Sequence, residues 1–389
     1  MLLIQNAKVL TMCGPTIEGG DILIDGRKII QTGKDLTVPE GCTIIDATGL
    51  LAAPGFIDAH CHMGLCSTGS DYSLYDCNEC SDPITPHMRA VDGYDPRQKS
   101  LKSALRGGVT TIMTGPGSSN IIGGQFAIFK TAGGTIEESL VKAPAAMKAA
   151  FGQNPMRIYG KEQKHAPITR MGIAAQMREF LRAAKNYALA VDRAQTEADK
   201  PAYNEKYEAM LPVFRNEIPM KIHAHRVDDM STAIRICTEF GLSFTLDHCT
   251  QAHVAATEFR GKLKGAIVGP FVYVPDKQEV EDVHYGTAAA LHKQGIKVAI
   301  ASDWPIWPME LFGLQAGLAI RDGLTEEDVW KMVTINPAEI LGIDSRVGSL
   351  EPGKDADIVL YCGNPLRDVG TYAQITIING QIVYSAGKE

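Results

Sequence analysis

The sequence predicts an α/β protein in which a (β/α)8 TIM-like barrel is joined to a small β-sandwich domain built from both termini. Three observations lead to this prediction. Short apolar segments alternate with helical stretches through the middle of the chain, which is typical of a parallel α/β architecture. Eight candidate strands fall within about 250 residues, the usual size of such a barrel. Both chain ends have β-strand patterns, so we expect the sandwich at 1–53 and 346–389 and the barrel at 54–345.

The two chain ends carry the same kind of turn signal. Asp25-Gly26 lies between two short apolar segments, which predicts a type I′ hairpin, and Asn379-Gly380 lies between two more. Shared turn chemistry favours one sheet built from both ends, although two unrelated hairpins would give the same local pattern. We expect strands here at 2–4, 7–10, 21–24, 28–31, 43–46, 356–361, 375–378 and 381–384.

The barrel elements are expected as alternating strands and helices. Apolar runs bounded by turn residues predict the strands, and longer segments with helical periodicity predict the helices. The expected strands are 56–59, 109–113, 125–129, 146–151, 220–223, 243–247, 266–268 and 297–301. The expected helices are 96–106, 169–198, 205–216, 230–240 and 279–294.

The composition limits which binding partners and which cellular compartment we expect. The net charge is -7 and Lys and Arg do not cluster, which argues against nucleic-acid binding. No apolar run approaches the ~18 residues of a membrane span, and the first residues lack the basic start of a signal peptide. Nine cysteines without an export signal favour reduced thiols in the cytoplasm. Cys77 and Cys80 have the spacing of a zinc knuckle or a redox pair, but no second pair follows, and we interpret the spacing as incidental.

A His-x-His pair ends the first expected barrel strand. Because side chains alternate along a strand, His60 and His62 point to the same face. Two neutral imidazoles about 6–7 Å apart can hold one ion such as zinc. The motif alone is weak, since two surface histidines would also give it. Its position at the carboxyl end of a buried strand strengthens the prediction, because parallel barrels keep their chemistry there.

Three later strand ends carry further metal-binding side chains. His223 ends the fifth strand with His225 on the same face, His248 ends the sixth, and Asp303 follows the eighth. A lone histidine beside a strand is more often a hydrogen-bonded core residue than a ligand. Parallel strands deliver their carboxyl ends to one face, however, so four such ends predict one shared metal site. Histidine ligands leave a position open for a metal-activated water, and Asp303 can take up its proton and pass it to a leaving nitrogen.

These motifs resemble those of the amidohydrolase superfamily, and in particular its imidazolonepropionase-like amidohydrolases. The likeness spans the chain and lies in the segments 54–62, 222–225, 247–248, 301–305, 334–342 and 348–357. It implies a metal-binding barrel with a β-sandwich built from both termini. It also implies a set of metal ligands, with the last of them acting as general base: His60, His62, His223, His248 and Asp303. The resemblance leaves His225 on the substrate side or around the ligands.

Two departures from the family pattern bear on metal number and reaction type. A second ion would need a bridging group, for which Lys148 is the candidate if it is carbamylated, although a surface or helix-adjacent lysine fits the position as well. Relatives carry an acidic residue where this chain has Gln153, which weakens the case for two ions. Heterocycle deaminases of the superfamily have a Glu where this chain has Arg226. Arg226 therefore argues for hydrolysis of an amide-like bond and could bind a substrate carboxylate, or it is a solvated surface residue.

We therefore expect a cytoplasmic, metal-dependent hydrolase that cleaves a carbon–nitrogen bond of a small amide, cyclic amide or dipeptide-like molecule by metal-activated water. The expected metal is zinc, with manganese or iron as alternatives, at one or two ions per chain. We expect a homo-oligomer with a small-molecule substrate and with neither nucleic acid nor membrane as partner. The alternatives are a heterocycle aminohydrolase and a non-catalytic, metal-containing barrel that binds a ligand.

Overall fold

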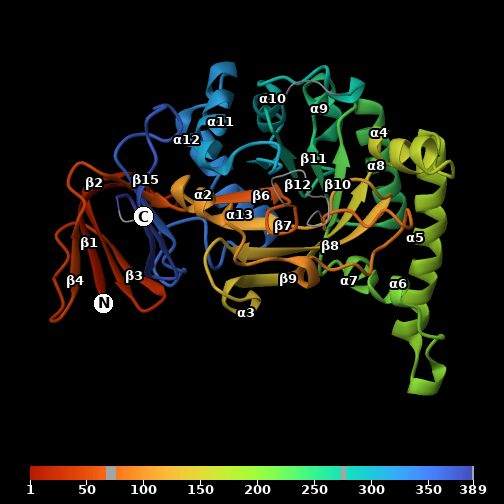
Figure 1. The fold of residues 1–389 in the computed structure, drawn as a ribbon, viewed down its shortest axis with the longest axis horizontal. Coiled ribbons are helices and arrows are strands. Elements are labelled where there is room, and N and C mark those ends of the chain that lie inside the picture. Colours follow the sequence, from red (N-terminus) through yellow and green to blue (C-terminus); the bar gives the residue numbers. More distant parts are fainter. Residues whose placement is uncertain (67–75, 273–276, 388–389) are drawn as a thin grey trace.

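The computed structural model describes residues 1–66, 76–272 and 277–387, and within these ranges the strands form two eight-stranded sheets. One sheet combines both chain ends, and the other is the barrel. In Figure 1 the terminal sheet lies at one end of the molecule and helix α5 (Arg170–Arg193) at the other, with the barrel between them.

Both termini contribute to the first sheet, whose order is β16-β15-β14-β5-β1-β2-β3 with β4 paired to β1. Strand β14 of the C-terminal segment pairs antiparallel with β5 of the N-terminal segment, so the ends are not two unrelated hairpins. The expected strands 2–4 and 7–10 are one strand with a register shift between Ile4 and Ala7. The bounds are β1 (Leu2–Val9), β2 (Ile17–Asp25), β3 (Lys28–Gly33), β4 (Thr43–Asp46), β5 (Leu51–Pro54), β14 (Ile358–Tyr361), β15 (Ala373–Ile378) and β16 (Gln381–Ser385).

The two predicted hairpins have different turns. Asn379 and Gly380 have φ values of 51° and 74°, and a type I′ turn requires positive φ at both central residues. In the other hairpin Asp25 still pairs with Lys28, so the central residues are Gly26 and Arg27, and only Gly26 has a positive φ (53°). The prediction of a type I′ turn at Asp25-Gly26 is therefore wrong, because the turn begins one residue later.

All eight expected barrel strands are present and form a nearly closed barrel. The two ends of the strand path meet where the Asp303 backbone N–H donates to the His60 carbonyl oxygen at 3.0 Å. The bounds are β6 (Phe56–Cys61), β7 (Val109–Thr114), β8 (Ile122–Lys130), β9 (Leu140–Ala150), β10 (Met220–Ala224), β11 (Phe244–His248), β12 (Gly265–Val268) and β13 (Val298–Ile300).

Strand β8 departs from the expected all-parallel barrel, because it runs antiparallel to both β7 and β9. Residues 115–121 connect β7 to β8, and residues 131–139 connect β8 to β9. Neither connection has the dozen or more residues that a parallel crossover needs. The other barrel strands share one direction and deliver their carboxyl ends to one face of the barrel.

Helices follow most of the parallel strands, and three of the expected helices differ from the observed ones. The expected helix 96–106 is wrong in its first half, because the helix begins only at Leu101. The segment 205–216 is split into two short helices, the second of which has a proline in its first turn. The expected helix 279–294 is wrong in its first half, because Glu279 lies in a 3-10 turn, η4 (Gln278–Val280), and the helix begins at Thr287. The other bounds are α1 (Ala90–Gly93), α2 (Leu101–Arg106), α3 (Ile136–Ser139), α4 (Gln153–Pro155), α6 (Glu205–Glu208), α7 (Leu211–Phe214), α8 (Val227–Phe240), α9 (Ala252–Phe259), α10 (Thr287–Lys293), α11 (Phe312–Gly317), α12 (Glu326–Met332) and α13 (Ile335–Leu341).

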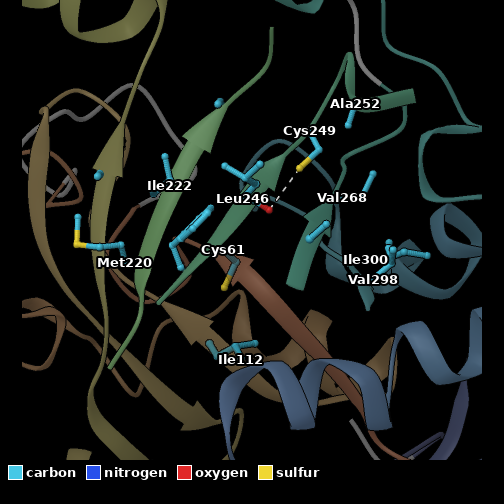
Figure 2. Close-up of a cluster of buried hydrophobic side chains, with 14 of the residues drawn as sticks. Cys61, Ile112, Met220, Ile222, Leu246, Cys249, Ala252, Val268, Val298 and Ile300 are labelled. Atoms are coloured by element: carbon cyan, nitrogen blue, oxygen red, sulfur yellow. Dashed lines mark hydrogen bonds between the residues drawn. The ribbon is translucent and has the colours of Figure 1, made fainter. Parts of the chain in front are cut away.

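The core lies around the barrel strands, and most of these strands are buried on both faces. Figure 2 shows part of it, in which Ile222 of β10, Leu246 of β11 and Val268 of β12 lie on neighbouring strands. The Cys249 thiol, just past the end of β11, donates to the Leu246 carbonyl oxygen at 3.4 Å. This packing fixes the strand ends and the side chains that leave them.

A buried ion-pair network, here called the Lys130 network, joins the terminal sheet to the barrel. Lys130 of β8 is 2% exposed, and its ammonium lies 2.5 Å from the carboxylate of Asp357 and 3.2 Å from that of Asp355. Asp355 also pairs with Lys28 at 2.9 Å and Arg346 at 2.8 Å. Burial opposes the ionisation of Asp355, but the surrounding cations outweigh it and lower its pKa. One buried barrel ammonium therefore contacts two carboxylates near the C-terminal strands.

A disulfide joins Cys66 to Cys77, which contradicts the expectation that the thiols are all reduced. The backbone N–H of Cys66 donates to the His62 carbonyl oxygen at 2.9 Å, so the turn after the His-x-His pair brings Cys66 toward Cys77. Cys80 is a free thiol, and the Cys77–Cys80 spacing is incidental, as expected. Within the described ranges, none of the helices has the length and apolar character needed to span a bilayer.

Candidate metal centre

Three potential ligand atoms from the first and last barrel strands converge at the carboxyl ends of the strands. His60 belongs to β6, His62 follows it, and Asp303 follows β13. Asp303 Oδ1 lies 3.4 Å from the Nε2 atoms of both His60 and His62. The two imidazole rings are 5.3 Å apart at an interplanar angle of 81°. Two imidazole nitrogens and a carboxylate oxygen at this spacing could share one divalent ion.

The other ring nitrogen of each histidine, Nδ1, already makes a hydrogen bond. His62 Nδ1 donates to the Gly115 carbonyl oxygen at 2.7 Å, and His60 Nδ1 donates to Asp247 Oδ2 at 2.8 Å. Each Nε2 therefore keeps a free lone pair. His60 Nε2 is buried and has no hydrogen-bond partner in the described part of the chain. Buried polar atoms are normally satisfied, so this orphaned nitrogen and its neighbours fit a divalent metal.

Asp247 and Lys221 hold His60 in place from the strands opposite. Lys221 Nζ lies 3.2 Å from the buried Asp247 carboxylate and donates to the Ala59 carbonyl oxygen at 2.9 Å. Burial opposes the ionisation of Asp247, but Lys221 and His60 outweigh it and lower its pKa. Burial, assisted by the positive charges of Lys148 and Lys221, lowers the pKa of His60 to about 3. The His60 imidazole is therefore neutral at pH 7, which is the form that binds metals.

The backbone is strained where two of the predicted ligands leave their strands. His248, Cys249 and Asp303 have positive φ values of 68°, 54° and 50°. Such values are uncommon for residues with a side chain and cost of order 1–3 kcal/mol each. Strain of this kind concentrates at functional sites. Here it accompanies His248 and Asp303 side chains that both line the same cavity.

The other predicted histidines lie beside these groups. His248 Nδ1 donates to the Gly269 carbonyl oxygen at 2.9 Å, which leaves its Nε2 free. The His248 ring centroid is 4.9 Å from that of His60 and 4.6 Å from that of His223. His225 stacks on His248 at 5.0 Å. The structure thus gathers the histidines of all the predicted strand ends at one face of the barrel.

Lys148 of β9 is fully buried, and its Nζ has no hydrogen-bond partner among the described residues. It is paired in register with Lys221 of β10. The Lys221 ammonium donates to the nearby carboxylate of Asp247. Burial lowers the pKa of Lys148 to about 8. A fraction of this amine is neutral at neutral pH, and the neutral amine is the form that can react with carbon dioxide to give a carbamate.

Arg226 does not reach the site. Helix α8 begins at the next residue, and the Arg226 guanidinium donates to the two carboxylate oxygens of Asp228 at 2.9 and 3.1 Å. Arg226 is absent from the described lining of the cavity at the strand ends. The geometry therefore gives no support to Arg226 as a substrate-binding residue and agrees with a surface ion pair.

Sequence reasoning missed Glu279, which the structure places in the site. Glu279 is 2% exposed, and its Oε2 accepts a hydrogen bond from the Gln153 backbone N–H at 2.8 Å. Its Oε1 lies 4.0 Å from His225 Nε2. Because the sequence predicted a helix over 279–294, Glu279 was expected in that helix and was not named as a site residue. The signal that could have found it is its position after the seventh strand, because such loops overhang the carboxyl face of a barrel.

A cavity of about 520 Å³ opens at these strand ends. Its lining combines predicted ligands with amide and basic side chains, including His62, His223, His225, His248, Asp303, Asn78, Gln153, Asn154, Arg157 and Lys277. A larger cavity of about 1030 Å³ lies between the terminal sheet and α12. It borders neither of the two groups of potential metal ligands found in the described part of the chain. Of these two cavities, only the one at the strand ends is therefore lined by potential metal ligands.

Comparisons with known proteins identify the family to which this chain is similar. A model of the amidohydrolase family matches residues 51–383. An amidohydrolase from Thermotoga maritima MSB8 has a solved structure that superposes with a TM-score of 0.95 at 40% identity, covering 99% of this chain and 100% of that one. The imidazolonepropionase of Thermoplasma acidophilum is 24% identical over 95% of this chain and 90% of its own length. The amidohydrolase tasK of Hapsidospora irregularis is 28% identical over 89% of this chain, but the match spans only 38% of tasK.

Proposed function

Because the chain belongs to the amidohydrolase family, as its motifs predicted, we propose that it uses a divalent metal and water to hydrolyse a carbon–nitrogen bond of a small amide, cyclic amide or dipeptide-like molecule. The observation that carries this proposal is the convergence of His60 Nε2, His62 Nε2 and Asp303 Oδ1. A divalent ion held there would lower the pKa of a water molecule and polarise the bond under attack.

Asp303 is assigned two roles, as a metal ligand and as the general base. Burial opposes its ionisation, but the neighbouring imidazoles of His248, His60 and His62 outweigh it and hold its pKa well below the usual range. A carboxylate is therefore available at neutral pH. In this position it would accept the proton of the attacking water and deliver it to the leaving nitrogen.

His223 and His248 are proposed to complete the ligand set. Imidazole and carboxylate donors suit zinc best, with manganese and iron as alternatives. A carbamate on Lys148 would add a bridging oxygen, and the burial of this lysine without a hydrogen-bond partner among the described residues supports that assignment. A structural lysine would instead be expected to pair with a nearby carboxylate, as Lys221 does with Asp247.

One observation favours a second candidate, a heterocycle aminohydrolase. Deaminases of the superfamily need an acid to protonate a ring nitrogen, and the position that supplies it holds Arg226 in this chain. Glu279 is a buried carboxylate 4.0 Å from His225 Nε2, and it could take that role from another loop. Amide hydrolysis is preferred because it needs no group beyond the ligands and Asp303.

A cytoplasmic location and a homo-oligomeric state stay predictions.

Turnover assays on the zinc- or manganese-loaded protein test the proposal. The panel should contain N-acyl amino acids, lactams, Xaa-Pro dipeptides and amino-substituted heterocycles. Release of an acid and an amine, or opening of a lactam, is the expected result, whereas ammonia released only from heterocycles would favour the second candidate. Asp303→Asn should lower kcat by about 10²–10⁴-fold, and Asp192→Asn, at an exposed position of α5, should leave it unchanged. A loaded protein with no turnover on this panel would contradict the proposal and favour a non-catalytic barrel.

A further inference from the structure

Helix α5 buries one of its faces and leaves the opposite face exposed. The buried face packs against α6, α7 and α8. Its buried side chains are those of Ile173, Ala174, Met177, Phe180, Leu181, Ala184, Tyr187 and Ala188. In Figure 1, α5 lies at the edge of the molecule, so its opposite face points away from the barrel and is open to a partner.

The exposed face, here called the outer face, carries a residue at every third or fourth position, which is the spacing of neighbours on one side of a helix. Its members are all exposed, and they are Met171, Ala175, Glu179, Arg182, Asn186 and Leu189. The two ends of the face are apolar, because Met171 is 79% exposed and Leu189 is 43% exposed. The outer face therefore has apolar ends and a charged centre.

The charged centre has no partner within the described chain. Neither Glu179 nor Arg182 makes an ion pair or a side-chain hydrogen bond with a described residue. The neighbouring Arg178 is already paired with Glu239 of α8 at 2.7 Å. A hollow of about 550 Å³ lies over the same part of the helix, and small side chains such as that of Ala175 help to line it. Such a groove can receive the side-chain ridge of a second helix.

The outer face is complementary to itself when its direction is reversed. Its midpoint lies between residues 180 and 181. A twofold axis at this point would pair two identical helices antiparallel, with each residue opposite the one at the same distance on the other side of the midpoint. The matched positions span about 27 Å of helix. The resulting pairs are Glu179 with Arg182, Ala175 with Asn186 and Met171 with Leu189. Opposite charges meet at the centre, a small side chain leaves room for a larger one, and the apolar ends cover each other.

A parallel pair of helices lacks this complementarity. Each residue would then face its own copy, which sets Glu179 against Glu179 and Arg182 against Arg182, and like charges side by side are unfavourable. We propose that α5 is a dimer interface, in which the outer faces of two copies of the chain pack antiparallel and Glu179 of each copy pairs with Arg182 of the other. None of the outer-face residues belongs to the described lining of the cavity at the strand ends, so this inference does not depend on the proposed function.

Sedimentation velocity of the full-length protein over a range of micromolar concentrations tests this interface. The wild type should sediment with twice the chain mass of 42.0 kDa. Glu179→Arg and Arg182→Glu should each raise the dissociation constant of the dimer by about 100-fold, because the twofold axis places like charges in the interface twice. The charge-swapped variant Glu179→Arg/Arg182→Glu should restore the dimer, since opposite charges meet again. Glu258→Arg, the same change at an exposed position of α9, is the matched control and should leave the dimer intact.

Met171→Lys tests the apolar ends of the outer face. It should raise the dissociation constant by about tenfold, because an apolar contact is lost at both ends of the interface, whereas Met171→Leu should preserve the dimer. Circular dichroism should show the wild-type fold in every variant, since these side chains are exposed.

A wild type that is monomeric at every concentration would overturn the proposal. A dimer that Glu179→Arg leaves unchanged would also overturn it, because the interface would then lie on another face. The same holds for a charge-swapped variant that dissociates as readily as the single variants, since the two side chains would then not face each other.

Discussion

Replacing Asp247 by asparagine tests the contact on which the position of His60 depends. The change keeps the shape of the side chain but removes the negative charge that the Lys221 ammonium faces at 3.2 Å, where both side chains are at most 1% exposed. Removing one partner of a buried ion pair costs about 3–5 kcal/mol. The hydrogen bond to His60 Nδ1 also loses its charge, and changes of this kind lower metal affinity by about 10–100-fold.

Two measurements separate these effects. Urea unfolding of metal-free protein reports the stability loss, and zinc titration reports the affinity loss. In the double variant Asp247→Asn/Lys221→Met no unpaired ammonium remains, so most of the stability should return while zinc affinity stays low. The reasoning is refuted if Asp247→Asn unfolds within about 0.5 kcal/mol of the wild type, or if its zinc affinity is unchanged.

The pH dependence of this stability term follows from the lowered pKa of Asp247. A carboxyl group whose pKa is lower in the folded state stabilises the fold above its unfolded pKa, which is about 4. That contribution is lost as the pH falls through the folded pKa. The difference in stability between the wild type and Asp247→Asn should therefore be constant from about pH 5 to 8 and shrink below about pH 4.

Three further predictions concern other parts of the molecule. Lys130→Met should lower the free energy of unfolding in urea by about 3–5 kcal/mol because it removes the ion-pair partner of the buried Asp357 carboxylate, whereas Lys28→Met, at a side chain 47% exposed, should cost under about 1 kcal/mol; equal losses would contradict the Lys130 network. ¹³C-labelled bicarbonate should give a carbamate NMR signal that Lys148→Met lacks and that grows as the pH rises through about 8, where the amine becomes neutral; a wild-type spectrum without the signal would make Lys148 a structural lysine. Reducing the Cys66–Cys77 disulfide should lower stability by about 3 kcal/mol in urea, and a Cys66→Ser/Cys77→Ser variant should match the reduced protein and not respond to reductant.

The ligand-bearing strand ends could be predicted because local patterns determine them. A buried apolar run followed by His60, His223, His248 or Asp303 specifies a strand and the side chain that leaves it. Parallel strands place such side chains on one face without any further information. The joint sheet of the two termini followed in the same way from strand patterns and turn residues at both ends.

Other features depend on contacts between distant segments, which a local pattern does not contain. The reversed direction of β8 was hidden by uncertain strand bounds, and only the true ends reveal connections too short for a parallel crossover. Glu279 reaches the site because its carboxylate binds the Gln153 backbone, a contact across 126 residues. The Cys66–Cys77 pairing depends on how the chain folds after His62, and an odd cysteine count does not identify it.

Metal analysis of the purified protein is the most direct test of a metal centre at the barrel strand ends. The wild type should contain, or take up on addition of zinc or manganese, at least one ion per chain. Asp303→Ala should lose an ion, and His248→Ala should bind metal more weakly, while both keep the wild-type circular dichroism spectrum. A folded wild-type protein that takes up neither zinc nor manganese would contradict the metal centre and leave only the barrel.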